Sequence, residues 1–323
     1  MKVYILGMDG YLGWPLRDAL LEAGHTVEGC DNFVRRHTAK SLVPLTPTLR
    51  RAYITDFNVA RDYVSLLADL RHMQPDAVVH LAQIPSAPFS MRDLDHAQHV
   101  HENNLNSTLA LIYAVKDVCP SAHIMKLGSM GEYIPSSWYH LTKIHDSANL
   151  KWACKHWGLR CTDIMQGPVY GVGGRFDYDE EWGTVINRWV CMGLAERDLL
   201  VYGSGEQVRG FLPIQDSMAC FKIVLQNPPG PGHYRVINQY AEKYTLNELA
   251  SMVAALTGVS IQRIANPRRE SLSYEDDIGN GWLIEHGYQP SVDAKVVISE
   301  LIEQVRPFKS RIDVAKFEPR IRW

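Results

Sequence analysis

The chain of 323 residues is 46% hydrophobic and 21% charged, which is ordinary for a soluble globular protein. Its formal net charge of −3 gives no electrostatic basis for nucleic-acid binding, which calls for a clustered basic face. The apolar runs are too short to cross a bilayer and no signal-peptide cleavage site follows the first one, so we expect a cytoplasmic protein with no membrane partner.

Strand-like runs alternate with helix-length segments in the first half of the chain. The expected elements are a strand at Val3–Leu6, a helix at Pro15–Ala23, and further strands at Val27–Asp31, Ala77–Ala82, Ile124–Gly128 and Arg160–Met165. This alternation predicts βαβ units, and hence an α/β fold of the Rossmann type with a doubly wound parallel sheet.

The second half is more irregular, because proline- and glycine-rich turns interrupt it. Leu246–Leu256 has the pattern of an amphipathic helix, and Thr245 begins it with a capping-box-like start. We predict one domain over residues 1–167, with returns to its sheet near 208–236, and a smaller C-terminal α/β domain over 168–323.

A glycine-rich turn, Gly7-Met8-Asp9-Gly10-Tyr11-Leu12-Gly13, comes directly after the first strand. Gly7 permits the tight turn, Gly10 lets the backbone approach a phosphate, and Gly13 lets helix and strand pack closely. Asp31 closes the second strand 21 residues after Gly10, where its carboxylate would accept the ribose hydroxyls of a dinucleotide. The pattern predicts a bound dinucleotide with its phosphates on the amide groups at the helix start.

The choice between NAD and NADP depends on Asp31, whose carboxylate would repel a ribose 2′-phosphate. Arg35 and Arg36 could hold that phosphate, or they could be a solvated charge pair on a loop. We favour NAD because of the carboxylate. Asp56, which follows Ile54-Thr55, is expected to touch the adenine.

Tyr139 and Lys143 are four residues apart, so both can point from one helix face into one cleft. An ammonium beside the phenol would favour the phenolate, which could take a hydroxyl proton while C4 of a sugar gives up hydride. Ser129, just past a strand that ends at Gly128, would bond to the same oxygen. The alternative is that Tyr139 is only an aromatic residue of a helix.

Together these motifs resemble those of the extended short-chain dehydrogenase/reductases, a family of NAD-dependent nucleotide-sugar epimerases and dehydratases. The resemblance is sharpest to the UDP-sulfoquinovose synthase branch, and its most specific match is Ser129-Met130-Gly131-Glu132-Tyr133. Other matching stretches run from end to end of the chain, at Ser86–Met91, Lys126–Tyr133, Tyr139–Ser147, Gly203–Phe211, Val236–Gln239 and Asn266–Arg268. The resemblance implies a UDP-hexose that bound NAD⁺ oxidises at C4 to a 4-keto intermediate, followed by loss of the 6-hydroxyl and addition of a sulfite-derived nucleophile at C6.

The chain also departs from the patterns of this family. Ordinary 4,6-dehydratases carry an Asp-Glu pair where this chain has Met130-Gly131, so Glu132 and His140 remain as proton carriers near C5 and C6. Glu132 could equally be a structural carboxylate that accepts backbone amides. The synthase branch has a Gln-Arg pair where this chain has Ile84-Pro85, and the loss of a guanidinium weakens the expectation of sulfite capture. The chain is also short between Tyr133 and Tyr139 and between 171 and 175.

The resemblance implies the following sets of site residues. The catalytic set is Ser129, Tyr139, Lys143, Glu132, Met130 and His140. The NAD-binding set is Gly7, Gly10, Tyr11, Leu12, Gly13, Asp31, Asn32, Arg35, Arg36, Asp56, Phe57, Leu81, Ala82, Gln83, Asn104, Tyr139, Lys143 and Gln166. The nucleotide-sugar set is Pro88, Ser90, Ser129, Met130, Asn187, Arg209 and Arg268, with the two arginines against the diphosphate.

Several alternatives and partners remain open. A 4-epimerase, or a dehydratase that adds no sulfite, is the alternative enzyme, and a non-catalytic sensor of NAD or a nucleotide sugar is the alternative outside catalysis. We expect no metal site at the cluster of His96, His99 and His101, because hydride chemistry of this class needs no metal and an exposed helix is the more ordinary context for these histidines. The apolar helices expected near 98–118 and 139–157 predict a homodimer joined through a four-helix bundle.

Overall fold

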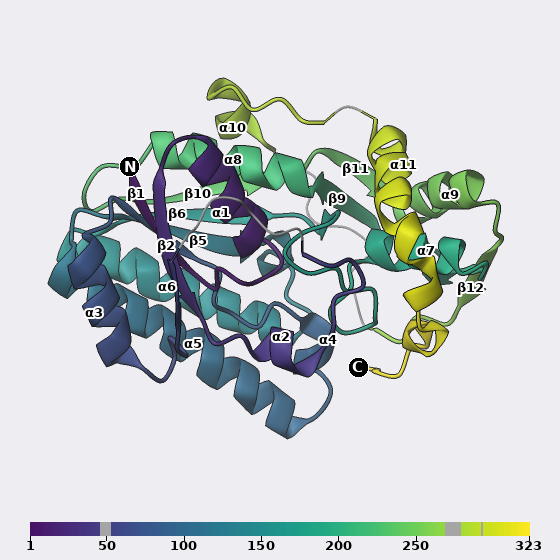
Figure 1. Ribbon diagram of the computed structural model, residues 1–323, viewed down its shortest axis with the longest axis horizontal. Helices are drawn as coiled ribbons and strands as arrows, with labels where there is room; N and C mark the ends of the chain where they lie inside the picture. Colours follow the sequence, from purple (N-terminus) through teal and green to yellow (C-terminus); the bar gives the residue numbers. More distant parts are fainter. Residues whose placement is uncertain (46–52, 269–278, 292) are drawn as a thin grey trace.

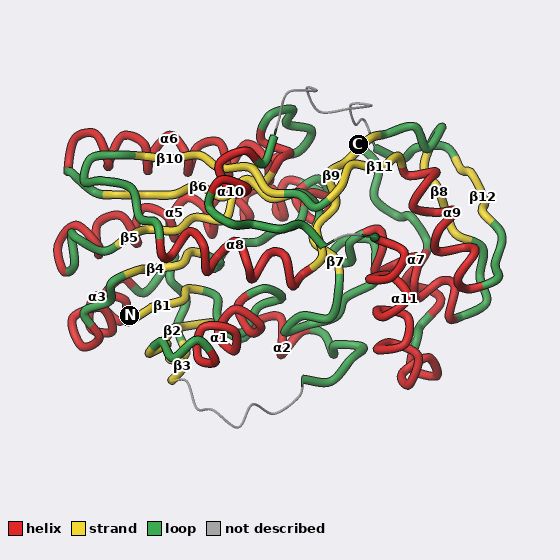
Figure 2. The backbone as a smooth tube through the Cα atoms, turned by 90° about the horizontal axis from the view of Figure 1, so that it is seen from above, coloured by secondary structure: helices red, strands yellow, loops and turns green. Residues whose placement is uncertain are grey.

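The computed structural model describes residues 1–45, 53–268, 279–291 and 293–323, and within them seven parallel strands form one large sheet (Figure 1). The strand order is β3-β2-β1-β4-β5-β6-β10, which can be followed from above in Figure 2. The strands are β1 (Lys2–Leu6), β2 (Thr26–Asp31), β3 (Tyr53–Asp56), β4 (Ala77–His80), β5 (His123–Ser129), β6 (Arg160–Gln166) and β10 (Tyr234–Gln239). The order reverses between β1 and β4, and a crevice at such a point is where α/β sheets bind ligands.

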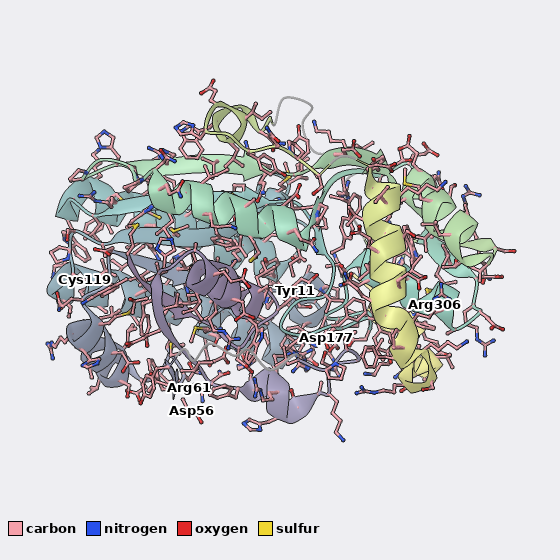
Figure 3. All side chains as sticks on the ribbon, turned by 45° about the horizontal axis from the view of Figure 1, so that its top comes forward. Tyr11, Asp56, Arg61, Cys119, Asp177 and Arg306 are labelled. Carbon is pink, nitrogen blue, oxygen red and sulfur yellow. The ribbon has the colours of Figure 1, made fainter. Side chains whose placement is uncertain are left out.

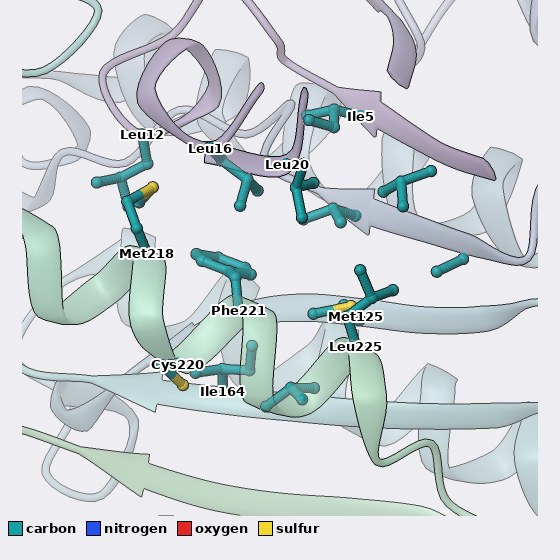
Figure 4. Close-up of a cluster of buried hydrophobic side chains, with 14 of the residues drawn as sticks. Ile5, Leu12, Leu16, Leu20, Met125, Ile164, Met218, Cys220, Phe221 and Leu225 are labelled. Carbon is teal, nitrogen blue, oxygen red and sulfur yellow. The ribbon is translucent and has the colours of Figure 1, made fainter. Parts of the chain in front are cut away.

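Helices cover both faces of this sheet because its strands are apolar on both sides. In β1, Val3 and Ile5 pack into one hydrophobic cluster, whereas Tyr4 and Leu6 pack into another. The first cluster lies under α1 (Gly13–Glu22) and α8 (Ile214–Gln226), as Figure 4 shows. The second lies under α3 (Tyr63–Met73), α5 (Leu94–Val118) and α6 (Trp138–Trp157).

A second unit stands beside the large sheet, at the right of Figure 1. Its core joins Trp189, Val253 and Ile298, which belong to three different helices. The helices are α7 (Val185–Leu194), α9 (Leu246–Thr257) and α11 (Ala294–Val305), and the strands are β7 (Val169–Tyr170), β8 (Leu199–Tyr202), β9 (Val208–Pro213), β11 (Glu242–Thr245) and β12 (Ile261–Ile264). The shorter elements of the chain are α2 (Val34–Thr38), α4 (Ala87–Ser90), η1 (Met130–Glu132), α10 (Gly281–Glu285), η2 (Arg306–Arg311) and η3 (Val314–Phe317).

The predicted α/β doubly wound fold is confirmed. All five strands expected in the first half are present, although β4 ends at His80 and leaves Leu81 and Ala82 beyond the strand. The α9 helix begins with the expected capping box, in which the Glu248 amide donates to Thr245 Oγ1 at 3.1 Å. Among the residues that the structure describes, no helix combines the length and the apolarity needed to span a membrane.

Residues 171–184, which we call the crossing segment, run from the second unit over the first glycine turn. The Gly174 amide donates to the Tyr11 carbonyl at 2.9 Å, and Arg175 Nη2 donates to the Ala39 carbonyl at 2.6 Å. A Cβ atom on Gly173 would lie 2.2 Å from the Tyr11 carbonyl oxygen, so this close approach of two backbones requires glycine. The contacts fix the second unit against the glycine turn.

Candidate active site

A cavity of about 980 Å³ opens at the carboxyl ends of the parallel strands. The first unit lines it with residues that end or follow strands, such as Gly7 after β1, Asp31 in β2 and Ser129 in β5. The second unit contributes side chains that include Arg209 and Arg268. Two sets of residues that are far apart in the sequence therefore face one space.

The glycine turn fits the pyrophosphate of a dinucleotide. Gly7 has a φ of 81°, and a Cβ atom there would lie 2.7 Å from the backbone of both Leu81 and Ala82. A Cβ atom on Gly13 would lie 2.3 Å from the Gly7 carbonyl oxygen. The turn lines the cavity, so side chains at Gly7 and Gly13 would disturb the surface on which phosphate groups rest.

Asp31 lies at the cavity with its carboxylate anchored by the backbone. Oδ2 accepts from the Asp9 amide and Oδ1 from the Phe33 amide, both at 2.9 Å, while burial raises the pKa of Asp31. Arg36 is paired with Asp9, and Arg35 Nη2 lies 3.1 Å from Asp177 Oδ2. Because both arginines are already bound to carboxylates, the structure supports the reading of Asp31 as the ribose ligand of NAD.

Asp56 is exposed at the end of the edge strand β3 and does not line the cavity (Figure 3). Its neighbour Phe57 does line the cavity. Side chains alternate along an extended chain, so one residue's difference decides which group can reach an adenine. Of these two residues of the expected NAD-binding set, Phe57 therefore lines the cavity and Asp56 does not.

Of the three central catalytic candidates, two line the cavity and the third, Lys143, lies behind its wall. Tyr139 and Ser129 both line it, and the Tyr139 amide is held by Ser90 Oγ at 3.1 Å. Lys143 lies behind Tyr139, with its Nζ 5.8 Å from the centre of the tyrosine ring. This Nζ donates to the Leu127 carbonyl at 2.6 Å and to Gln83 Oε1. Burial, together with the Lys126 charge, lowers the pKa of Lys143.

Glu132 takes the structural role that the sequence left open. Its Oε1 accepts from the Ser129 amide at 2.9 Å and lies 3.2 Å from Lys126 Nζ. The same Nζ lies 2.9 Å from Asp163 Oδ2, and Lys126 and Asp163 are fully buried. Burial alone would lower the pKa of Lys126, but the carboxylates outweigh it and raise that pKa. Glu132 does not line the cavity and is committed to this network, which lies under the turn that carries Ser129.

His140 is a better candidate than Glu132 for contact with a sugar. It lines the cavity, and its Nδ1 accepts from the Ser136 amide at 3.2 Å, so a neutral ring carries its proton on Nε2. Burial, with a contribution from the Arg209 charge, lowers the pKa of His140 to about 4. The ring is therefore a neutral donor at physiological pH.

Other expected residues line the cavity or support its wall. Gln166 bonds to Ser217 at 2.9 Å, and Asn187 Oδ1 accepts from the Gly171 amide at 3.0 Å. Asn104 is buried behind the wall, where its Oδ1 accepts from the Ile84 amide at 2.8 Å. Of the expected site residues, those outside the lining are Asp56, Ser90, Asn104, Met130, Glu132 and Lys143, and those in it are Gly7, Gly10, Tyr11, Leu12, Gly13, Asp31, Asn32, Arg35, Arg36, Phe57, Leu81, Ala82, Gln83, Pro88, Ser129, Tyr139, His140, Gln166, Asn187, Arg209 and Arg268.

Two residues of the crossing segment that line the cavity, Glu181 and Trp182, were not identified from the sequence. Trp182 lies 3.8 Å under the Arg35 guanidinium and 5.1 Å from the Phe89 ring, measured to ring centres. Glu181 lies 3.1 Å from Arg92. No local motif marks these residues, because their partners are on average a hundred or so positions away along the chain. The one local feature in the sequence that could have drawn attention to them is Trp182, which directly follows the acidic run Asp179-Glu180-Glu181.

Known proteins resemble this chain along its whole length. The model of the NAD dependent epimerase/dehydratase family matches residues 3–238. A UDP-sulfoquinovose synthase from Sulfolobus acidocaldarius is 35% identical over 387 residues, which cover 100% of this chain and 98% of that protein. The chloroplastic UDP-sulfoquinovose synthase of Spinacia oleracea is 32% identical, with coverage of 100% and 79%.

Among solved structures, the UDP-glucose 4-epimerase of Thermotoga maritima with UDP-glucose has a TM-score of 0.81 at 20% identity, and it covers 95% of this chain and 99% of its own. At that identity the likeness shows the fold alone. Both sequence relatives align over more positions than the 323 residues of this chain, so they carry insertions relative to it. The chain belongs to the NAD dependent epimerase/dehydratase family, and it is an NAD-dependent enzyme that acts on nucleotide sugars.

Proposed function

We propose that this enzyme oxidises a UDP-hexose at C4 and works through a 4-keto intermediate, in the manner of a UDP-sulfoquinovose synthase. The observation that carries the proposal is that Tyr139, Ser129 and the glycine turn line one cavity, with Lys143 directly behind Tyr139. The two synthases at 35% and 32% identity support the same reaction.

The division of labour in the cavity follows from where its residues lie. NAD, when bound, accepts hydride from C4. The Tyr139 oxygen takes the proton of the C4 hydroxyl, and Ser129 Oγ bonds to the same sugar oxygen. The Lys143 ammonium stabilises the phenolate, and this attraction is strong because the site is buried and its effective dielectric constant is low.

His140 would serve the later steps at C5 and C6. A 4-ketone makes the C5 proton acidic, and the 6-hydroxyl needs a proton in order to leave. A neutral ring with its proton on Nε2 can donate a hydrogen bond to the 6-hydroxyl as it leaves, and the proton lost from C5 completes the departing water. Glu132 lacks this freedom, because Lys126 and the Ser129 amide hold it outside the cavity.

We assign the two units to the two ligands. Residues 1–167, with β10 completing the sheet, would hold NAD through the glycine turn, Asp31 and the ends of the strands. Residues 168–323 would mainly hold the nucleotide sugar, with Arg209 and Arg268 on the diphosphate because guanidinium groups bind phosphate through charge-assisted hydrogen bonds.

A second reaction, 4-epimerisation or dehydration without sulfite, is favoured by one feature of the wall. Ile84 and Pro85 line the cavity where the synthase branch has Gln-Arg, and neither can bind an anion. Mass spectrometry of UDP-glucose after incubation, with and without sulfite, separates the outcomes. A sulfonate adduct supports the synthase, loss of water supports a dehydratase, and unchanged mass with an inverted C4 supports an epimerase.

The Tyr139→Phe variant tests whether the site is catalytic at all. We expect turnover of UDP-glucose to fall by at least about a hundredfold, since a general base typically contributes that much. Tyr63→Phe, on helix α3 and outside the cavity lining, is the matched control and should keep full turnover. If Tyr139→Phe matched wild type in both turnover and NAD binding, the proposal would be wrong and a ligand sensor would replace it.

We further propose that two copies of the chain pair through α5 and α6. These helices pack on each other and leave large apolar side chains exposed on their outer surface. The side chains are Leu109, Tyr113, Trp138, Leu141, Ile144 and Trp152. Light scattering should give the mass of two 36.6 kDa chains, and Leu141→Asp should give that of one. A wild-type monomer at micromolar concentration would refute the pairing.

A further inference from the structure

A buried chain of polar side chains continues behind Lys143, away from the cavity. Lys143 Nζ donates to Gln83 Oε1, and Gln83 Nε2 donates in turn to Asp146 Oδ2. Asp146 is fully buried and follows Lys143 by three residues on α6, so both side chains project from the same helix face. These hydrogen bonds run from Lys143 through Gln83 to Asp146, and they join helix α6 to the loop after β4.

The chemistry of an amide makes this order directional. The oxygen of Gln83 only accepts hydrogen bonds and its nitrogen only donates them. An ionised Asp146 only accepts, so it selects the amide rotamer whose nitrogen faces it. The oxygen of Gln83 then points at Lys143, where it accepts from the ammonium. With the amide reversed, two donors would face each other and Lys143 would lose this partner.

Charged and titratable groups face this chain from every neighbouring element. Thr108 on α5 contacts Gln83 Nε2 at 3.3 Å, and His80 on β4 contacts Thr108 at 3.1 Å. Burial lowers the pKa of His80 to about 3, so it is neutral. From β5, β6 and η1 come the charges of Lys126, Asp163 and Glu132, of which the lysine repels Lys143 and the carboxylates attract it.

We propose that Asp146 is a positioning residue for Lys143, acting through Gln83. Its carboxylate fixes the Gln83 amide, and the amide oxygen keeps Lys143 charged and in place behind Tyr139. Burial raises the pKa of Asp146 and lowers that of Lys143, so both groups titrate nearer to neutrality than usual and each depends on the other's charge. This inference rests on the proposed function, since it assigns Lys143 a catalytic task.

The test compares Asp146→Asn, Gln83→Leu and the double variant with wild type. An asparagine can present either end of its amide, so it neither fixes Gln83 nor attracts Lys143. With isotope-labelled lysine, NMR follows the titration of the Lys143 ammonium, whose signal is assigned by its loss in Lys143→Arg. We expect the titration midpoint to fall by about one pH unit or more in either single variant. The double variant should shift by less than the sum of the two single shifts, because the part of the Asp146 effect that passes through Gln83 is already lost in Gln83→Leu, whereas its direct charge attraction is not.

The second readout is the pH profile of UDP-glucose turnover in the holoenzyme. Its alkaline limb should move to lower pH by the same amount, which at pH 8 is about a fivefold loss for a shift of one unit from a pKa of about 8. Asp69→Asn is the control, because Asp69 likewise accepts hydrogen bonds from side chains of other elements, Tyr4 and Thr55, but none of these residues lines the cavity, and its variant should leave the limb in place. A uniform loss of rate at every pH, an unmoved NMR midpoint, or additive shifts in the double variant would overturn the inference. If wild-type protein left UDP-glucose unchanged while the variants still showed the expected NMR shifts, the proposed function would be wrong and the positioning role of Asp146 would stand.

Discussion

Replacing Lys126 by methionine tests whether the network under Ser129 holds the fold together. Nζ of Lys126 lies within hydrogen-bonding distance of both carboxylates, at 2.9 Å from Asp163 Oδ2 and 3.2 Å from Glu132 Oε1. Methionine fills most of the same volume but leaves two buried carboxylates facing each other without a cation. Removing one partner of a buried ion pair costs about 3–5 kcal/mol, and we expect a loss of that size in the free energy of unfolding at pH 7.

The pH dependence of the loss identifies its cause. The folded variant relieves the repulsion by keeping one proton that the unfolded chain loses near pH 4, until the pH passes the raised pKa of the carboxyl pair in the folded state. Its stability therefore falls as the pH rises, by up to about 1.4 kcal/mol per pH unit. In wild type the Lys126 ammonium compensates the charge of both carboxylates, and its contribution disappears only when the pH rises past the raised pKa of Lys126.

Urea unfolding at several pH values between 5 and 8 measures this difference. Lys116→Met is the control, because Lys116 forms an exposed pair with Asp117 at 3.0 Å and should cost less than about 0.5 kcal/mol. A loss in Lys126→Met below about 1 kcal/mol, or one that does not change with pH, would show that the network contributes little to stability.

Two further predictions concern the glycine turn and His140. Gly7→Ala should weaken NAD binding at least tenfold by calorimetry, because its Cβ would clash with the Leu81 carbonyl. Gly24→Ala is the control and should bind NAD normally, because Gly24 has a similar φ of 82° but nothing within 4 Å of a Cβ atom. Equal losses in the two variants would point to backbone strain alone. His140, whose pKa burial lowers to about 4, stabilises the fold above about pH 6.5, and this contribution, up to about 3 kcal/mol, is lost as the pH falls toward 4. His140→Asn should therefore lose less stability between pH 6.5 and pH 4 than wild type, and equal losses in thermal melts would contradict this reasoning.

The features that sequence predicts best in this protein are those that depend on neighbours in the chain. The glycine turn, the acid at the end of β2 and the Tyr139–Lys143 spacing each lie within one local element, so their positions in the fold follow from strand and helix periodicity. Lys126 shows the limit. It lies in an apolar strand, and only the pairing of β5 with β6 brings Asp163 to it.

Arg35, which follows β2, shows the same limit. Sequence could not decide whether Arg35 binds phosphate, because its partner Asp177 is 142 positions away. Asp146 was overlooked for a related reason. As an acid on a helix it looks like a surface residue, and only the packing of α6 on the sheet shows that it is fully buried.

The crossing segment limits how far this protein can be taken apart. A fragment that stopped before residue 171 would keep the glycine turn but would leave the Tyr11 carbonyl without the Gly174 amide and Arg35 without Asp177. Its strands could still pair, yet the side of the cavity that the crossing segment covers would open to water. The nucleotide-binding unit could therefore not be transplanted as a self-sufficient module, because part of the wall of its cavity comes from residues 171–184, which follow it in the sequence.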